Sequence, residues 1–235
     1  MVLSDLRHLN SLLVFRSIVN GMNTLEEISD DSKVAKVTTN EILHNLEKRN
    51  ILTSYTNTKK PVGRPTKFYD ISNLYNILYI EVKPRSVVGA LFNVNWDVVS
   101  KLEVEINELF PEKSALNKII THFTKSEYYK YTIETLLLYS SIDPQTLDIP
   151  VTPTTTCDLI LRSLSLNNNK TKLITLFDKK VLLVNSNYKY IDIPTEELEK
   201  YLVIDEKIDI IPNDIPCEIL ESFTRIIVHY LEKLI

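Results

Sequence analysis

Apolar residues recur at helical spacing in the first part of the chain. Between Leu6 and Val19 they return every three or four positions, which is the period of an amphipathic helix. A short second helix is predicted from Thr24 to about Ser32. The Thr24 hydroxyl can accept from the amide of Glu27, while the Glu27 side chain reaches back to the start of the helix.

A third helix is predicted to begin near Val37 or Thr38. It turns Ile42, Leu43 and Leu46 inward, and Thr39 is expected to be half-buried. The polar residues left on its outer face are Asn40, Glu41, His44, Asn45 and Lys48.

Two strands are predicted next, from Ile51 to Tyr55 and from Thr66 to Ile71, because both stretches are rich in β-branched and aromatic residues. The run between them breaks regular structure and contains Gly63. Three helices followed by two strands with a basic turn is the order of a winged helix-turn-helix. The third helix of such a domain enters the major groove, and the turn, or wing, reaches adjacent phosphates. We predict a DNA-binding domain over residues 1–72.

The charge distribution favours this interpretation. The whole chain has a formal net charge of −4, yet residues 32–67 contain eight lysines and arginines against two glutamates. Such a local cationic patch suits double-stranded DNA. The residues predicted to contact DNA are Lys33, Lys36, Thr38, Thr39, Asn40, His44, Lys48, Lys59, Lys60, Arg64 and Lys67. Asn40 and His44 are candidates for reading bases, and Arg64 for entering the minor groove or clamping a phosphate. The alternative is that these residues form an ordinary solvated face and a surface turn.

After Ser72 the pattern becomes strand-like, which predicts a second domain over residues 73–235. We expect an antiparallel meander, then a helix, a strand, a helix and further strands. The expected ranges are Leu74–Val82, Ser86–Val94, Val98–Ile106, Ser114–Lys125, Tyr131–Ser140, Thr154–Leu166, Leu173–Phe177 and Val181–Val184. Three strands, helix, strand, helix, strand is the order of one lobe of the ribonuclease-H-like or actin-like α/β fold. The predicted fold class is therefore α+β, a winged helix-turn-helix followed by a single such lobe.

A last helix from Asn213 carries a wide apolar stripe that includes Phe223 and Ile227. The stripe either packs on the sheet of its own domain or forms a dimer interface. A homodimer suits a helix-turn-helix protein that reads two half-sites.

Composition excludes several classes of function. No apolar run is long enough to span a bilayer and the N-terminus does not resemble a signal peptide, so we expect a cytoplasmic protein without a membrane partner. The four histidines and two cysteines lack metal-ligand spacing, so no metal site is predicted. The chain has three isolated glycines, which argues against a phosphate-binding loop and a nucleotide cofactor.

The two halves together resemble the ROK family of bacterial repressors and sugar kinases, which join a winged helix to an actin-like sugar-binding domain. The resemblance rests on Val34 to Leu52 as recognition helix and strand, Gly63-Arg-Pro as wing, and Ile77 to Ser100 as the first strands of the lobe. It implies a transcriptional regulator, most simply a repressor. A small-molecule effector of the second domain is left open.

The chain departs from that family where ATP would bind. The family ends the first strand of its lobe in an Asp-x-Gly phosphate turn, whereas this chain has Pro84 and no glycine between Ile80 and Arg85. The family's zinc-binding cysteines and its Glu-x-x-His motif are also absent. We therefore predict a reduced relative that is not an enzyme, with the lobe as scaffold, dimeriser or sensor. The alternative function is a winged-helix module that docks protein and does not bind DNA.

Overall fold

The computed structural model describes residues 3–56, 65–166, 172–176, 179–184, 187–191, 206–210 and 215–235. Its fold is mixed α+β. The chain divides into two compact units, Met1–Tyr75 with Tyr230–Ile235, and Asn76–His229. The long C-terminal helix contributes to both, because its last turn belongs to the first unit.

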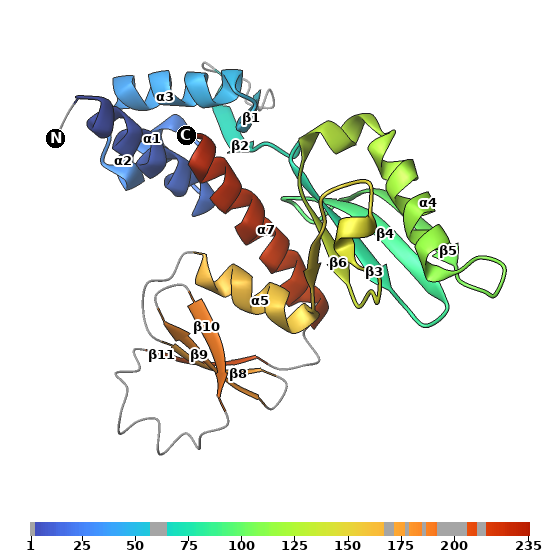
Figure 1. Cartoon of the computed structure of the whole chain (residues 1–235). Helices are drawn as coiled ribbons and strands as arrows, with labels where there is room; N and C mark the ends of the chain where they lie inside the picture. Colours follow the sequence, from blue (N-terminus) through green and yellow to red (C-terminus); the bar gives the residue numbers. More distant parts are fainter. Residues whose placement is uncertain are drawn as a thin grey trace. The chain divides into compact units, whose positions relative to one another are not determined.

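The first unit holds three helices and a two-stranded antiparallel ribbon (Figure 1). The elements are α1 (Leu3–Val19), α2 (Leu25–Ser32), α3 (Lys36–Lys48), β1 (Leu52–Thr56) and β2 (Lys67–Ile71). Phe15, Ile28, Leu43 and Ile51 are almost fully buried and come from α1, α2, α3 and the segment that leads into β1. Three helices and two strands therefore occur in the predicted order.

The prediction of one apolar face on the first helix is only partly right. Phe15 and Ile18 are buried, whereas Leu6 and Leu9 are exposed to 41% and 44%. Apolar residues occupy more of the helix surface than its neighbours can cover, so spacing alone did not identify the inward face.

The second unit is built on a five-stranded sheet with the strand order β5-β4-β3-β6-β7. The strands are β3 (Asn76–Val82), β4 (Ser86–Asn93), β5 (Val98–Glu105), β6 (Thr132–Leu138) and β7 (Thr152–Thr154). The predicted meander is confirmed, since β3, β4 and β5 pair antiparallel. β6 and β7 then add parallel strands on the other side of β3.

Helices pack on both faces of this sheet. α4 (Glu112–Thr124) buries Leu116, Ile119 and Phe123 in one core with Leu78 and Leu91 of the sheet. Side chains alternate between the faces of a strand, so Tyr79 and Phe92 point to the other side. There they contact Phe223 of α7 (Ile215–Leu234), with ring centroids 5.7 and 5.2 Å apart. Of the two alternatives for the apolar stripe of the last helix, packing on its own sheet is observed at Phe223.

The element order after β6 differs from the prediction. We predicted that a helix would follow β6 and that the next strand would come after this helix. In the structure the next strand, β7, comes first and joins the sheet beside β6, and the helix α5 (Thr156–Ser165) follows it. β7 is only Thr-Pro-Thr, too short to produce a strand pattern, and its proline is tolerated because it lies at the sheet edge. Short 3-10 helices at Glu127–Tyr131 and Pro144–Thr146 were also not predicted.

The predicted strands after α5 belong to a second sheet. Its order is β10-β9-β8-β11. The members are β8 (Lys172–Leu176), β9 (Lys179–Val184), β10 (Asn187–Ile191) and β11 (Glu206–Ile210). β8 pairs antiparallel with β9 and parallel with β11, so it is not part of the five-stranded sheet. The last two strands were not predicted.

Candidate nucleic-acid interface

The start of α2 is held by the contacts that the sequence predicts. The Glu27 amide donates to the Thr24 hydroxyl at 3.3 Å, and the Thr24 amide donates to the Glu27 carboxylate at 3.1 Å. Hydrogen bonds to its carboxylate, first from the Thr24 side chain and then from the amides of Asn23 and Thr24, lower the pKa of Glu27. Thr24 also forms a β-bridge with Phe68 of β2, and the Tyr69 amide donates to the Asn23 carbonyl at 2.8 Å. The ribbon is thereby attached to α2, which the sequence pattern did not indicate.

The connection from α2 to α3 is closed by buried hydroxyl groups. Lys33 adopts a left-handed conformation with φ of 58°, which ends α2. The carbonyl of Val34 then accepts from the Ser29 hydroxyl at 2.7 Å and from the Thr39 hydroxyl at 3.1 Å. α3 begins at Lys36, one or two residues earlier than predicted.

The prediction that Thr39 is half-buried and contacts DNA is wrong. Its side chain is fully buried and its hydroxyl is used by Val34. Ile42, Leu43 and Leu46 are buried on the same side, as predicted. Thr39 therefore orients α3 from inside the unit.

The opposite face of α3 is exposed. Asn40, His44 and Lys48 lie along it, and Thr38 is half-buried beside them. Val37 is 74% exposed at the first turn of the helix. From the sequence pattern Val37 is only part of the helix start, but an exposed valine on a polar face suits contact with a thymine methyl group.

Two of the lysines predicted to contact DNA, Lys36 and Lys67, form ion pairs within the unit. The Lys36 ammonium lies 2.7 Å from the Glu26 carboxylate, and this hydrogen bond raises the pKa of Lys36 and lowers that of Glu26. The Lys67 ammonium lies 2.8 Å from Glu47 and 5.0 Å from the centre of the Tyr69 ring. Lys33 and Lys48 are exposed and make no ion pair with any residue that the structure describes.

The pair between Lys67 and Glu47 joins the ribbon to α3. Glu47 also accepts from the Ser54 hydroxyl of β1. The hydrogen bond from Lys67 lowers the pKa of Glu47 most, and the bond from Ser54 adds to it. Glu47 raises the pKa of Lys67 in return. Lys67 therefore ties the start of β2, at the end of the ribbon next to the predicted wing, to α3.

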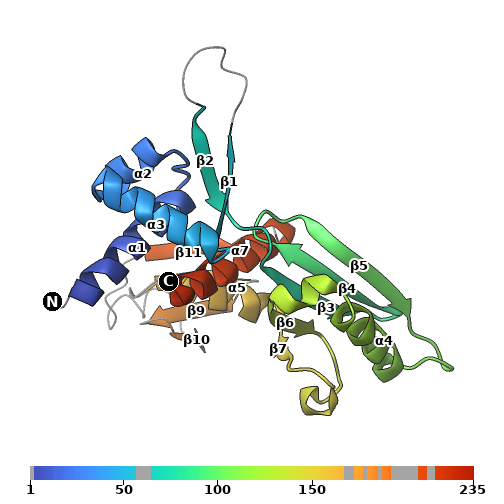
Figure 2. The same cartoon turned by 90° about the horizontal axis from the view of Figure 1, so that it is seen from above.

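The ribbon extends beyond α2 and α3 (Figure 2). β1 and β2 pair in register from Leu52 opposite Ile71 to Thr56 opposite Lys67. Tyr55 stacks on Phe68 with ring centroids 5.4 Å apart, and Tyr55 is 56% exposed. The predicted wing residues Lys59, Lys60 and Arg64 lie outside the described residues.

A concave surface of about 720 Å³ lies between the first turns of α2 and α3 and the start of β2. It brings together three predicted residues, Lys36, Asn40 and Lys67, with Val37 and Glu26. Because Glu26 lines it as well, the groove is mixed in charge. His44 and Lys48 lie further along α3, outside this groove.

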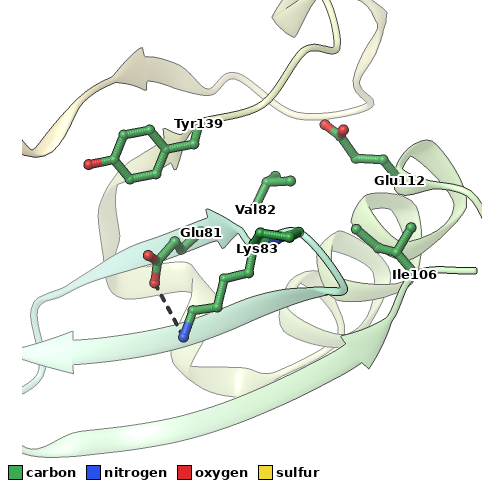
Figure 3. Close-up of a pocket in the computed structure, with 7 residues that line it drawn as sticks. Glu81, Val82, Lys83, Ile106, Glu112 and Tyr139 are labelled. Carbon is green, nitrogen blue, oxygen red and sulfur yellow. Dashed lines mark ion pairs between the residues drawn. The ribbon is translucent and has the colours of Figure 1, made fainter.

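A second cavity, of about 570 Å³, lies in the other unit at the carboxyl ends of β3 and β6 (Figure 3). Ligands in α/β folds often bind at such an edge. Here Glu81 pairs with Lys83 at 3.7 Å, and Glu112 accepts from the hydroxyls of Ser140 and Ser141. The Lys83 amide donates to Ser86 at 2.8 Å, and Pro84 has no amide hydrogen. Neither residue offers a backbone donor to a phosphate.

Within the described residues, no group of three histidine, cysteine, aspartate or glutamate side chains is placed to hold a metal ion. No described helix is long and apolar enough to cross a membrane.

No protein-family model matches the chain, and neither does any curated protein. A solved ROK-family transcriptional regulator, a homologue of the Escherichia coli MLC protein, is 12% identical over 78% of this chain and 56% of its own, with a TM-score of 0.45. A ROK family protein from Streptococcus pneumoniae TIGR4 in complex with sucrose is 10% identical over 48% of this chain and 47% of its own, with a TM-score of 0.32.

A Bacteroides thetaiotaomicron protein with an actin-like ATPase fold and unknown function covers 63% of this chain and 96% of its own, at 10% identity and a TM-score of 0.28. The chain spans about half the length of the two ROK-family structures. The solved structures similar to this chain thus include ROK-family and actin-like proteins.

Proposed function

We propose that the chain is a sequence-specific, DNA-binding transcriptional regulator, most simply a repressor. Residues 1–75 act as a winged helix-turn-helix. The observation that carries the proposal is α3, which is oriented by buried hydroxyl groups on one side and presents Val37, Asn40, His44 and Lys48 on the other. A helix of this size fits the major groove, which is about 12 Å wide.

Each residue on that face has a role that its chemistry suits. Asn40 can bond an adenine at two points, and His44 can reach a base or a phosphate. Lys33 and Lys48 contact phosphates, as do Lys59 and Lys60 of the wing, while Arg64 enters the minor groove or clamps a phosphate. To contact a phosphate, Lys36 must break or share its ion pair with Glu26, and Lys67 must break or share its ion pair with Glu47.

Genome-wide footprinting of the purified protein on fragmented DNA from its own organism tests this function. It is done at two salt concentrations, with the wild type and with Lys59, Lys60 and Arg64 replaced together by alanine. We expect a few enriched sites with inverted-repeat symmetry, lost in the triple variant. Absence of enrichment even at low salt would exclude DNA binding.

A change on α3 shows whether base reading comes from this helix. Asn40→Ala should relax preference at one base position, since a two-point contact contributes about 1–3 kcal/mol of discrimination. Asn45→Ala is the matched control. Asn45 is exposed on the same helix but lies to one side of the row formed by Asn40, His44 and Lys48. Equal preference in both variants would contradict the assignment of Asn40.

A protein-docking module is the second candidate function. The mixed charge of the groove, in which Glu26 and Lys36 pair, favours it, because a pure phosphate surface would carry little negative charge. A protein partner retained by the triple alanine variant, together with no DNA affinity in the wild type, would support this candidate instead.

We also propose that the chain is not a sugar kinase. The occupied amide of Lys83 and the missing amide hydrogen of Pro84 support this proposal, since a phosphate cradle requires free backbone donors. Sugar-dependent ATP hydrolysis by the pure protein would contradict it.

A further inference from the structure

β5 forms one edge of the five-stranded sheet, with β4 on its inner side (Figures 1 and 2). Antiparallel strands bond through every second residue. The Ile106 amide donates to Arg85 at 2.8 Å, so Val104 and Leu102 are the next residues bonded to β4. The backbone groups of Lys101, Glu103 and Glu105 therefore point outward, where a further strand can pair with them.

The exposed side chains of this edge are complementary to themselves. Lys101 and Glu103 are both exposed and lie on either side of Leu102. If a second copy pairs antiparallel about a two-fold axis at Leu102, Lys101 of each copy lies opposite Glu103 of the other. Glu103 also accepts a hydrogen bond on one carboxylate oxygen from the Ser86 hydroxyl of the neighbouring β4 at 2.7 Å, which leaves its second oxygen for Lys101 of the other copy. Two opposite-charge pairs then stabilise the contact.

Other registers that keep the outward backbone groups aligned are less favourable. An axis at Glu103 keeps two pairs of Lys101 with Glu105 but places Glu103 opposite itself between them, and an axis at Lys101 places two lysines together. Like charges directly opposite each other destabilise a strand pair. If the axis lay between two residues, for example between Leu102 and Glu103, each residue that points outward would face a residue that is already bonded to β4. The hydrogen bonds between the two β5 strands could then not form.

A β-bulge limits the length of this pairing. The register of β5 with β4 shifts at Val99, between the pairs Leu91–Ser100 and Phe92–Val98. About an axis at Leu102, the regular pairing therefore runs from Ser100 to Val104 of each copy.

We propose that β5 pairs with β5 of a second copy and joins two five-stranded sheets into one ten-stranded sheet. The interface is isologous, with Lys101 and Glu103 selecting the register. It assigns a surface to the homodimer that we expect from the sequence for a helix-turn-helix protein that reads two half-sites. It does not depend on DNA binding, because the association is measured without DNA.

Charge exchange tests the pairing directly. Sedimentation equilibrium is run on the full chain, the single variants Lys101→Glu and Glu103→Lys, and the double variant. Each single change places like charges opposite each other twice and should weaken the dimer about tenfold. The double variant restores opposite charges and should recover the wild-type dissociation constant. Lys125→Glu, a reversal of the same sign at the exposed end of α4, is the matched control and should leave the dimer unchanged.

Circular dichroism and thermal unfolding show that the variants fold. A monomeric wild type, single variants that dimerise as well as wild type, or a double variant that does not recover would each overturn the proposal. In those cases Lys101 serves only to keep the edge strand from pairing, as edge lysines commonly do. DNA binding measured separately on the same variants distinguishes this failure from failure of the proposed function.

Discussion

The carbonyl of Val34 accepts two side-chain hydrogen bonds in a buried turn, from Ser29 and from Thr39. A threonine early in a helix with an exposed polar face suggests a surface contact, and only burial reveals its structural role. The orientation of α3 therefore depends on buried hydroxyl groups on its inner side.

Thr39→Val keeps the shape of the side chain and removes its hydroxyl. We expect the free energy of unfolding to fall by about 1 kcal/mol, because Val34 retains the bond from Ser29 but loses the other. Urea unfolding measures the change. Thr38→Val, at a half-buried neighbouring position, should stay within about 0.5 kcal/mol of wild type. An equal loss in both variants would contradict the role of Thr39.

The ion pair between Glu47 and Lys67 predicts how stability responds to acid. The folded-state pKa of Glu47 lies below its ordinary value because of the bonds from Lys67 and Ser54. Between the folded and the ordinary pKa the unfolded chain binds more protons. The pair's contribution is therefore complete above the ordinary pKa and is lost as pH falls through the folded pKa. Lys67, whose pKa is raised, loses its contribution only as pH rises through that raised value.

Glu47→Gln should remove this acid-dependent part of the unfolding free energy. The effect should be below about 1 kcal/mol, because the Lys67 side chain is 41% exposed and the pair is screened by solvent. Urea unfolding of wild type and variant across the acid range measures the difference. Glu41→Gln, an exposed glutamate on the same helix, is the control. Parallel pH curves for wild type and Glu47→Gln would show that the pair contributes nothing.

At the scale of elements, close approach of α4 to the sheet is made possible by Gly89. A Cβ atom at this position would lie 2.6 Å from Ile119 Cγ2 and 2.6 Å from Phe123 Cε2. From sequence alone Gly89 is an isolated glycine in a strand, and its partners on α4 are about thirty residues away in the chain. The helix that covers the strand therefore explains why this position has no side chain.

Gly89→Ala should destabilise the second unit by about 1–3 kcal/mol, the usual cost of overpacking a core. Thermal unfolding measures it. The sign of the change in unfolding free energy shows whether α4 obstructs this position, because a glycine-to-alanine change at an unobstructed position stabilises a protein by about 0.4–1 kcal/mol. A gain in stability would show that α4 does not approach β4 as closely as the structure has it.

For the molecule as a whole, DNA affinity should depend steeply on salt. If about six phosphates are neutralised, the slope of log affinity against log salt should be near −5. Lys48→Ala should make this slope less steep by about 1, since one phosphate contact is lost. Lys125→Ala, at the end of α4, should leave it unchanged. A binding constant that does not vary with salt would contradict a phosphate interface.

Local features of the chain were predictable because their causes are local. The capping contacts of Thr24 and Glu27 involve residues three positions apart, and the meander of β3, β4 and β5 follows from strand patterns joined by short turns. The start of α3 and the bounds of β1 were within one or two residues for the same reason.

Contacts between distant parts of the chain were decided by tertiary structure. The parallel pairing of β3 with β6 brings together Asn76 and Thr132, and the very short β7 is a strand only because it lies beside β6. Placing β8 in a separate sheet depends on its pairing with β11, which no local pattern encodes.

The sequence by itself determined the order of the helices and strands of the first unit and the concentration of positive charge there, because periodicity and charge are properties of neighbouring residues. Tertiary structure decided which of those residues face outward. It buried Thr39, paired Lys36 with Glu26 and Lys67 with Glu47, and left Val37 exposed, because burial and ion pairing depend on residues brought together by folding.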